Sequence, residues 1–174
     1  MAKKSTSVIR MAINDSEDLY STYSTENNIV LNNEAVAFLE SELKGVESKD
    51  NIKIVIETPT KVSDERKNKC VKSIKNHFKG IISEAKDLIK RYLIIALIMF
   101  VATCLLATLQ ILGNNFGFPE ILMIFLEILT WVFGWEFIDI LVFSVPIKKH
   151  KTKKYAKIIN AKFEFVVKKN NEEK

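Results

Sequence analysis

The spacing of hydrophobic and polar positions divides the chain at residue 92, where two long apolar runs begin. The first run, 92–112, holds 21 residues without a charged side chain, and the second, 119–145, is longer. About 20 helical residues cross a hydrocarbon core of about 30 Å, so each run can span a bilayer. Residues 113–118 between them are rich in glycine and asparagine, which is typical of a turn. The pattern predicts a transmembrane helical hairpin.

Before and after the hairpin, shorter patterns predict a small domain. Apolar runs at 8–13 and 52–57 are typical of strands, and segment 34–45 has helical spacing between an asparagine cap and a glycine. A further strand pattern occupies 161–167. Because a hairpin returns the chain to the side it left, this last strand can pair with the first two. The expected fold class is therefore an α+β membrane protein, with a two-helix hairpin and a small cytosolic α+β domain.

Residues 63–91 predict one helix that continues into the first span. It opens with Ser63 and two acidic residues, a favourable helix start. Apolar residues then recur in steps of three and four, as in a narrow coiled-coil seam: Val71, Ile74, Phe78, Ile81, Ala85 and Leu88. Two interpretations remain open. The seam packs on the domain's own sheet, or it bundles the helices of several subunits above a shared pore.

The charges orient the hairpin. Residues 61–91 hold 10 basic and 4 acidic side chains, residues 147–174 hold 10 and 3, and the turn contains no Lys or Arg. The positive-inside rule then places both termini in the cytoplasm. The first 30 residues show no signal-peptide pattern. The expected segments are a cytosolic α+β part (1–62), a basic helix (63–91), the first span (92–112), an extracytoplasmic turn (113–118), the second span (119–145) and a basic cytosolic tail with a terminal strand (146–174).

Part of this positive charge lies too far from the bilayer to serve lipid binding alone. Helix geometry puts the lysines 13 to 25 residues before Tyr92 about 20–38 Å from the interface, beyond a Debye length of about 8 Å. Two interpretations remain: a solvated helix surface, or a site for a polyanionic cytosolic ligand. The candidate ligand-binding residues are Lys72, Lys75, Lys79, Lys148, Lys149, Lys151, Lys153 and Lys154.

Acidic residues inside the second span are the main candidates for membrane chemistry, because ionisable groups in a bilayer are costly. Glu127 lies about 12 Å in from Pro119. It is either a hydrogen-bonded residue that joins helices or part of a carboxylate ring that favours cations. On a helix, Glu127 shares a face with Thr130 and Gly134. The first span offers a matching stripe of small and polar residues, whose Thr and Gln side chains can donate hydrogen bonds to a buried carboxylate: Ala96, Thr103, Ala107 and Gln110. The predicted pore-lining residues are Glu127, Thr130, Gly134, Glu136 and Asp139.

Catalytic and metal-binding patterns are absent from the sequence. It contains no phosphate-binding glycine loop, GxSxG or HExxH motif, and His77 and His150 lack partners at metal-ligand spacing. An enzyme is therefore disfavoured, and no cofactor or metal is expected. Cys70 and Cys104 have no CxxC neighbour, which indicates reduced, structural thiols.

The end of the second span carries a W-x-x-x-W-E pattern, with Trp131, Gly134, Trp135, Glu136 and Asp139, followed by a basic run and a strand. This arrangement resembles the channel-forming transmembrane effectors of the Hailong anti-phage defence system. The resemblance implies a homotetramer in the bacterial inner membrane, held closed by DNA oligomers that a partner nucleotidyltransferase makes. It carries no individual ligand residues across.

The sequence thus favours an oligomeric, cation-conducting channel with a cytosolic gating domain, acting as a defence effector. Two alternatives stay open: a non-conducting membrane anchor that recruits a cytosolic partner, and a holin-like pore-forming toxin. Conductance distinguishes the channel from the anchor, and inhibition by a cytosolic ligand distinguishes it from the toxin.

Overall fold

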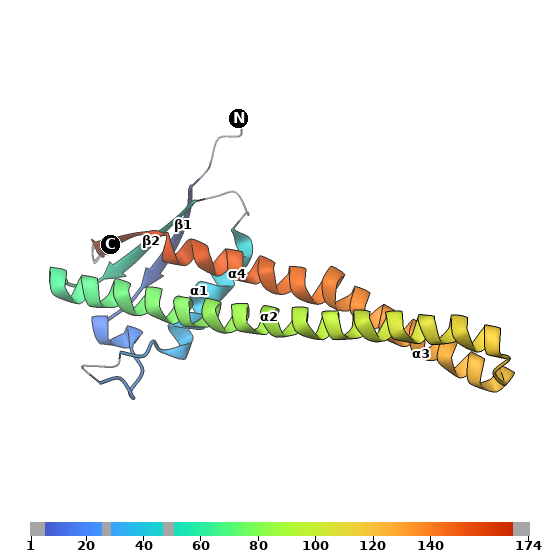
Figure 1. Ribbon diagram of the computed structural model, residues 1–174. Coiled ribbons are helices and arrows are strands. Elements are labelled where there is room, and N and C mark those ends of the chain that lie inside the picture. Colours follow the sequence, from blue (N-terminus) through green and yellow to red (C-terminus); the bar gives the residue numbers. More distant parts are fainter. Residues whose placement is uncertain (1–5, 26–28, 47–50, 169–174) are drawn as a thin grey trace. The chain divides into compact units, whose positions relative to one another are not determined.

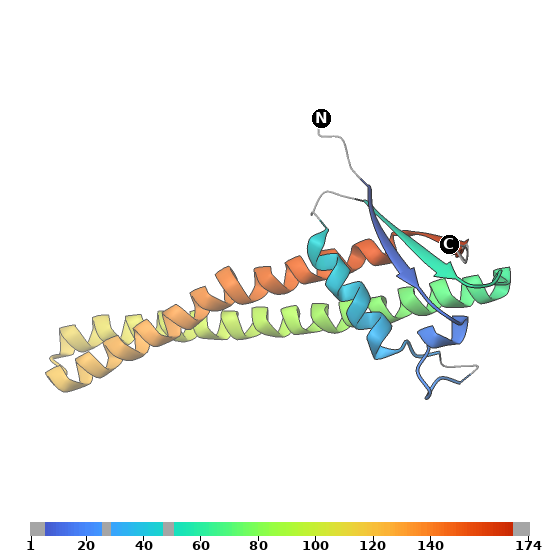
Figure 2. The same cartoon turned by 180° about the vertical axis from the view of Figure 1, so that it is seen from behind.

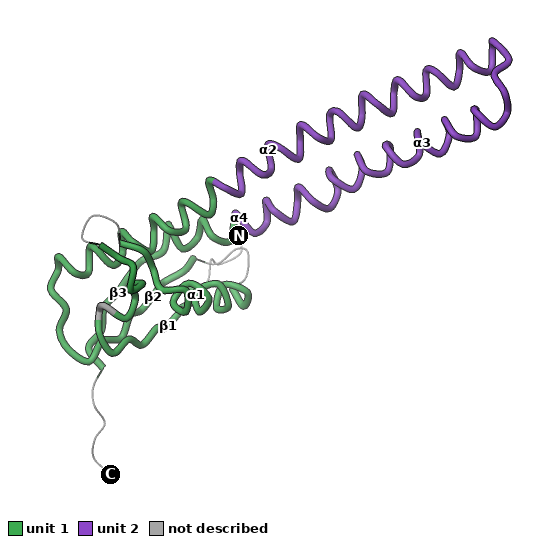
Figure 3. The backbone as a smooth tube through the Cα atoms, turned by 90° about the horizontal axis from the view of Figure 1, so that it is seen from below, with its two compact units in different colours: residues 1–83, 153–174 green, residues 84–152 purple. Residues whose placement is uncertain are grey.

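The computed structural model describes residues 6–25, 29–46 and 51–168. The chain forms two compact units, which Figure 3 colours separately. Residues 1–83 and 153–174 make up the sheet unit, and residues 84–152 make up the hairpin unit. The two ends of the chain therefore fold together, while the long apolar middle forms a unit of its own.

The sheet unit is built on three parallel strands, in the order β1 (Thr6–Ala12), β2 (Asn51–Thr58), β3 (Lys162–Val167). All three predicted strands are confirmed, and the C-terminal strand pairs with β2 as expected. The prediction needs one refinement. The strands run parallel and each connection contains helix, as in βαβ units, whereas the expected α+β class left the strand direction open. Figure 1 shows β1 and β2 side by side.

The core of this unit lies on one face of the sheet. Alternate strand residues point inward and are almost fully buried, including Ile9, Ile54 and Ile56. Helix α1 (Asn33–Gly45) adds buried leucines, and Asn32 caps it by accepting a hydrogen bond from the Glu34 backbone N–H at 3.2 Å. Figure 2 shows α1 crossing in front of the first part of α2. A short 3-10 helix, η1 (Ser16–Leu19), precedes α1.

Helix α2 (Asp64–Phe116) is a single run of 53 residues that contributes to both units. Its continuity was predicted, and so was the possibility that its seam packs on the sheet. The stripe that is buried in the sheet unit is Cys70, Ile74, Phe78 and Ile82. Its spacing is four throughout, so only two of the predicted seam residues belong to it. Leu88, a predicted seam residue, is 44% exposed. The domain's own core therefore takes up the middle of the seam, around Ile74 and Phe78.

The hairpin unit pairs the second part of α2 with α3 (Glu120–Asp139). The turn is shorter than predicted, because α2 continues through Phe116. Gly113 stays helical since its missing side chain leaves room for Phe118 and Met123; an added Cβ would lie 2.7 Å and 2.8 Å from their atoms. The reversal instead uses Gly117, whose φ of 68° suits glycine.

After α3 the chain stays helical but changes its winding. A π-helical segment, η2 (Ile140–Ser144), leads into α4 (Val145–Ile159), so the predicted basic tail begins as a helix. Pro146 explains the wider turn: it has no N–H, and its ring would clash with a carbonyl four residues earlier in an α-helix. The Val145 N–H bonds the Ile140 carbonyl, and both side chains are buried in the hairpin unit.

Candidate functional site

The surface of the hairpin is apolar where soluble proteins are polar. Two helical runs, 64–116 and 120–159, are long and apolar enough to cross a membrane, and only 6% of the most apolar window of each is buried. Side chains such as Leu97, Leu105 and Ile121 are 62–82% exposed. Monomeric soluble proteins rarely expose so large an apolar area. This exposure separates the two helices from the core helices of a soluble protein.

The interior of the hairpin uses the small and polar stripe that the sequence predicted on the first span. Ala96 is 2% exposed, and a Cβ added to Gly134 would lie 3.6 Å from the Thr103 side chain. The Gln110 amide donates a hydrogen bond of 2.8 Å to the Thr130 hydroxyl, which itself donates to the Leu126 carbonyl. Thr130 and Gly134 therefore join α3 to α2 within one hairpin.

Glu127 lies outside this packed face. Its side chain is exposed, and among the described residues it makes no hydrogen bond or ion pair. The expectation that Thr and Gln side chains of the first span would donate to it is wrong for a single hairpin, because Gln110 is engaged by Thr130. The carboxylate is therefore open to the surroundings of the hairpin.

The five predicted pore-lining residues do not share one face. Glu127 and Glu136 are nine residues apart on an unbroken α-helix, which places them on opposite sides. Glu136 is exposed and Asp139 is half-buried, near the end of α3 and the first turns of the basic α4. Glu127, Thr130 and Gly134 fall within an arc of about 60°, whereas Glu136 and Asp139 lie on other sides of α3.

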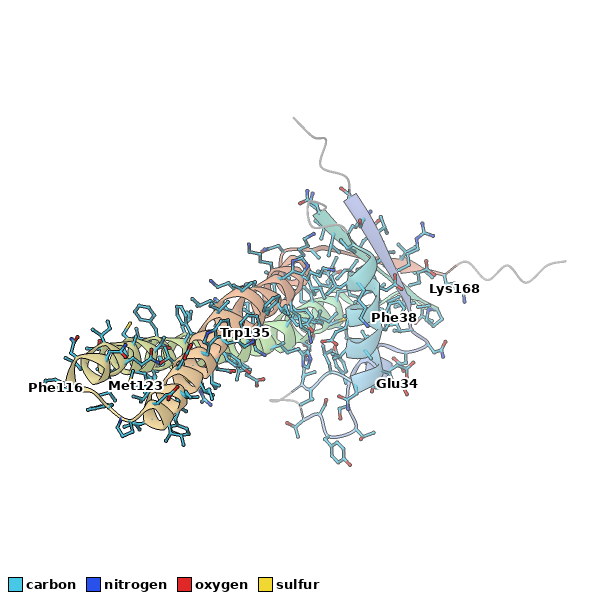
Figure 4. The ribbon with its side chains drawn as sticks, turned by 90° about the vertical axis from the view of Figure 1, so that its right-hand side faces the viewer. Glu34, Phe38, Phe116, Met123, Trp135 and Lys168 are labelled. Carbon is cyan, nitrogen blue, oxygen red and sulfur yellow. The ribbon has the colours of Figure 1, made fainter. Side chains whose placement is uncertain are left out.

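Two tryptophans dominate the exposed side of α3. Trp131 is 70% exposed and Trp135 is 58% exposed; Figure 4 labels Trp135 on this helix. They border a groove of about 470 Å³ whose other lining residues include Phe100, Thr103 and Gly134. Helix α3 continues through Gly134, and the irregular winding comes later, at η2.

The candidate ligand-binding lysines fall into two groups. Lys72, Lys75 and Lys79 lie within a narrow arc of α2 in the sheet unit, where the Lys75 ammonium lies 5.6 Å from the centre of the Phe163 ring. The others are on α4, and their spacing distributes them around most of its circumference. These are Lys148, Lys149, Lys151, Lys153 and Lys154. The first group therefore forms a compact stripe on α2, whereas the second group surrounds α4.

Other charges near the start of α2 are already paired. Lys67 and Lys69 form ion pairs with Asp64 at 2.8 Å and Glu65 at 2.9 Å. Hydrogen bonds from these lysines lower the pKa of both carboxyls. Arg66 and the lysines from 72 onward are in none of the ion pairs found among the described residues of α2.

Sequence reasoning missed a polar cavity of about 640 Å³ at the carboxyl ends of β1 and β2. Asn14, Thr60, Lys61, Ser63 and Arg66 contribute to its lining. The carboxyl edge of a parallel sheet is a common place for a ligand crevice. The sequence signal was available only after strand direction was known, because the cavity requires β1 and β2 to end side by side.

Cys70 is buried, as suits a structural thiol, whereas Cys104 is exposed on α2. Both are free, and burial raises the pKa of the Cys70 thiol to about 12, so it stays protonated and unreactive. In the described part of the chain, no three His, Cys, Asp or Glu side chains gather in a way that could hold a metal ion.

Comparison with known proteins does not extend this description. No protein-family model, curated protein or solved structure matches the chain. The class that the structure itself defines is a two-helix apolar hairpin, long enough to span a membrane, joined to a three-stranded parallel sheet that both ends of the chain build.

Proposed function

We propose that this chain is a subunit of an oligomeric, cation-conducting membrane channel with both termini in the cytoplasm. The observation that carries the proposal is the exposed Glu127 on a hairpin whose surroundings are otherwise apolar. A charged group at the centre of a bilayer costs about 2.5–3.5 kcal/mol on insertion scales, so such residues normally face other protein or water.

One hairpin cannot relieve this cost. Glu127 is exposed on the single hairpin, and two helices do not enclose a water-filled path. Several copies arranged in a ring place their carboxylates around a common axis, where a ring of negative charge favours cations. Glu136 and Asp139 lie on other faces near the end of α3, and they would then lie at the cytoplasmic opening of the pore.

The sheet unit supplies the proposed control. We propose that this unit binds a polyanion, because Lys72, Lys75 and Lys79 form a compact stripe and make no ion pair among the described residues. Helices α2 and α4 both run from the sheet unit into the hairpin unit. A ligand that biases the packing of these helices biases the hairpins they form. The resemblance to anti-phage channel effectors makes a short DNA oligomer the first ligand to test, with a nucleotidyltransferase as its source and a homotetramer as the expected assembly.

Planar-bilayer recording tests the conduction pathway. Glu127→Gln keeps size and hydrogen-bonding capacity but removes the charge, so the assembly stays intact while conductance and cation preference fall. Glu120→Gln is the matched control: it neutralises an exposed carboxylate in the first turn of α3, at the outer end. Equal conductance and equal selectivity of wild type and Glu127→Gln would rule out the pore role. A wild-type protein that assembles without conducting would favour the membrane anchor.

A further inference from the structure

Glu127, Trp131 and Trp135 form one exposed stripe along α3. They follow each other at intervals of four residues, so each is turned about 40° from the one before. All three side chains are exposed, the two tryptophans by 70% and 58%. A carboxylate acceptor and two indole donors thus lie in line on the side of the helix that α2 does not cover.

The depth of the tryptophans is unusual for a membrane helix. Trp131 and Trp135 are about 17 and 23 Å along a span of about 30 Å, counted from Glu120. Tryptophan normally lies at the membrane–water interface, where its N–H finds a partner. Neither indole makes a hydrogen bond among the described residues. Lipid tails offer no acceptor at this depth.

The groove beside the stripe is shaped for close approach by another helix. Its lining includes Gly134, Thr103 and Thr130 beside the two tryptophans, and a Cβ added to Gly134 would lie 3.6 Å from the Thr103 methyl group. Its volume is about 470 Å³. Small residues in such positions allow membrane helices to approach each other closely.

We propose that this stripe is the contact between neighbouring copies of the hairpin, in which indole N–H groups of one copy donate to the Glu127 carboxylate of the next. The inference rests on the proposed oligomer and specifies its interface. Each copy offers two donors and one acceptor group, so the surface is complementary to itself, which a lipid tail is not. One carboxylate oxygen remains free to face the pore.

Fluorescence quenching by brominated lipids tests whether another copy covers the stripe. The chain contains two tryptophans, so the fluorescence of the full-length protein in vesicles reports this stripe alone. The control variant carries Trp131→Phe, Trp135→Phe and Phe125→Trp. Phe125 has the same exposure as Trp135, 58%, but lies on another side of α3. We expect brominated phosphatidylcholine to quench wild type less than half as strongly as the control. Equal quenching would overturn the inference.

Subunit dissociation tests the hydrogen bonds themselves. The Trp131→Phe, Trp135→Phe variant should dissociate about tenfold more readily in vesicles, the size expected for two interhelical hydrogen bonds, as measured by energy transfer between labelled copies. In a Glu127→Leu background, the same two changes should have no further effect. Independent effects in the two backgrounds would show that the indoles and the carboxylate are not partners.

The two levels of the proposal fail differently. A wild-type protein that stays monomeric at every density in vesicles would remove both this interface and the proposed channel. A wild-type protein that assembles and conducts, with tryptophans fully open to brominated lipid, would remove this interface alone. Should the variants without native tryptophans fail to fold, judged by far-ultraviolet circular dichroism, the single variant Phe125→Trp replaces the control. Its added fluorescence should then be quenched more strongly than that of wild type, and equal quenching would again overturn the inference.

Discussion

Gly113 and Gly134 allow one substitution to be tested in two environments of the same hairpin. In Gly113→Ala, the new Cβ would lie 2.7 Å from Phe118 Cδ2, 3.2 Å from Phe118 Cγ and 2.8 Å from Met123 Sδ. The methionine can adapt, because its side chain is flexible. The ring cannot move without turning at its root, since the Phe118 backbone N–H bonds the Gly113 carbonyl at 2.9 Å and Pro119 follows.

The magnitude follows from two opposing effects. Overpacking costs about 1–3 kcal/mol, and replacing glycine by alanine within a helix returns up to about 1 kcal/mol. We therefore expect Gly113→Ala to destabilise the hairpin by roughly 1–2 kcal/mol. In Gly134→Ala the nearest contact, to the Thr103 methyl group, is an ordinary 3.6 Å. That variant should be neutral or more stable by up to about 1 kcal/mol.

Unfolding by increasing fractions of sodium dodecyl sulfate in mild detergent, followed by circular dichroism, measures both free energies. The predicted difference is one of sign. Two variants that shift in the same direction, or a Gly113→Ala hairpin as stable as wild type, would refute the packing described around Phe118.

Two further predictions concern the sheet unit. Lys72→Gln combined with Lys79→Gln should weaken the binding of a single-stranded DNA oligomer. The slope of log affinity against log salt should fall in magnitude by about 1.4, at about 0.7 for each phosphate that is no longer neutralised. Lys61→Gln is the control, and a larger effect of that change would place the site in the polar cavity. Ending the chain after Tyr155 removes β3 and the fully buried Ile158, whose removal alone costs about 2–5 kcal/mol. The thermal transition of the truncated protein should drop well below that of a chain ended after Lys168, and coincident melting curves would contradict the β2–β3 pairing.

The predictability of the chain differs between its two units for physical reasons. The strands, the Asn32 cap and the 53-residue helix follow from local propensity and from hydrophobic period, which a sequence records directly. The buried stripe of α2 was harder to predict. Both Val71 and Cys70 suit a core, and only the packing of α2 on the sheet determines that Cys70 is the buried one. The direction of the strands, and with it the polar cavity, depends on contacts between distant segments.

The candidate site was predictable in chemistry but not in direction. Glu127 stands out in any reading of the second span, and its depth follows from counting residues. Whether it bonds to the first span depends on which donors there are unoccupied, and the Gln110 amide already donates to Thr130. The turn was misplaced for a similar reason. Gly113 resembles a helix breaker by type, although its role is to leave space for a neighbouring ring.

The place of β3 in the chain has a consequence for how the protein is made. The central strand β2 pairs on one side with β1, which is synthesised before it, and on the other with β3, which is synthesised roughly 100 residues later. The whole apolar hairpin is translated in that interval. The sheet unit therefore completes its core only after the hairpin has been synthesised. A message cut short within the hairpin yields a protein whose sheet unit lacks β3. One edge of β2 then stays unpaired, and the incomplete unit is a substrate for proteases.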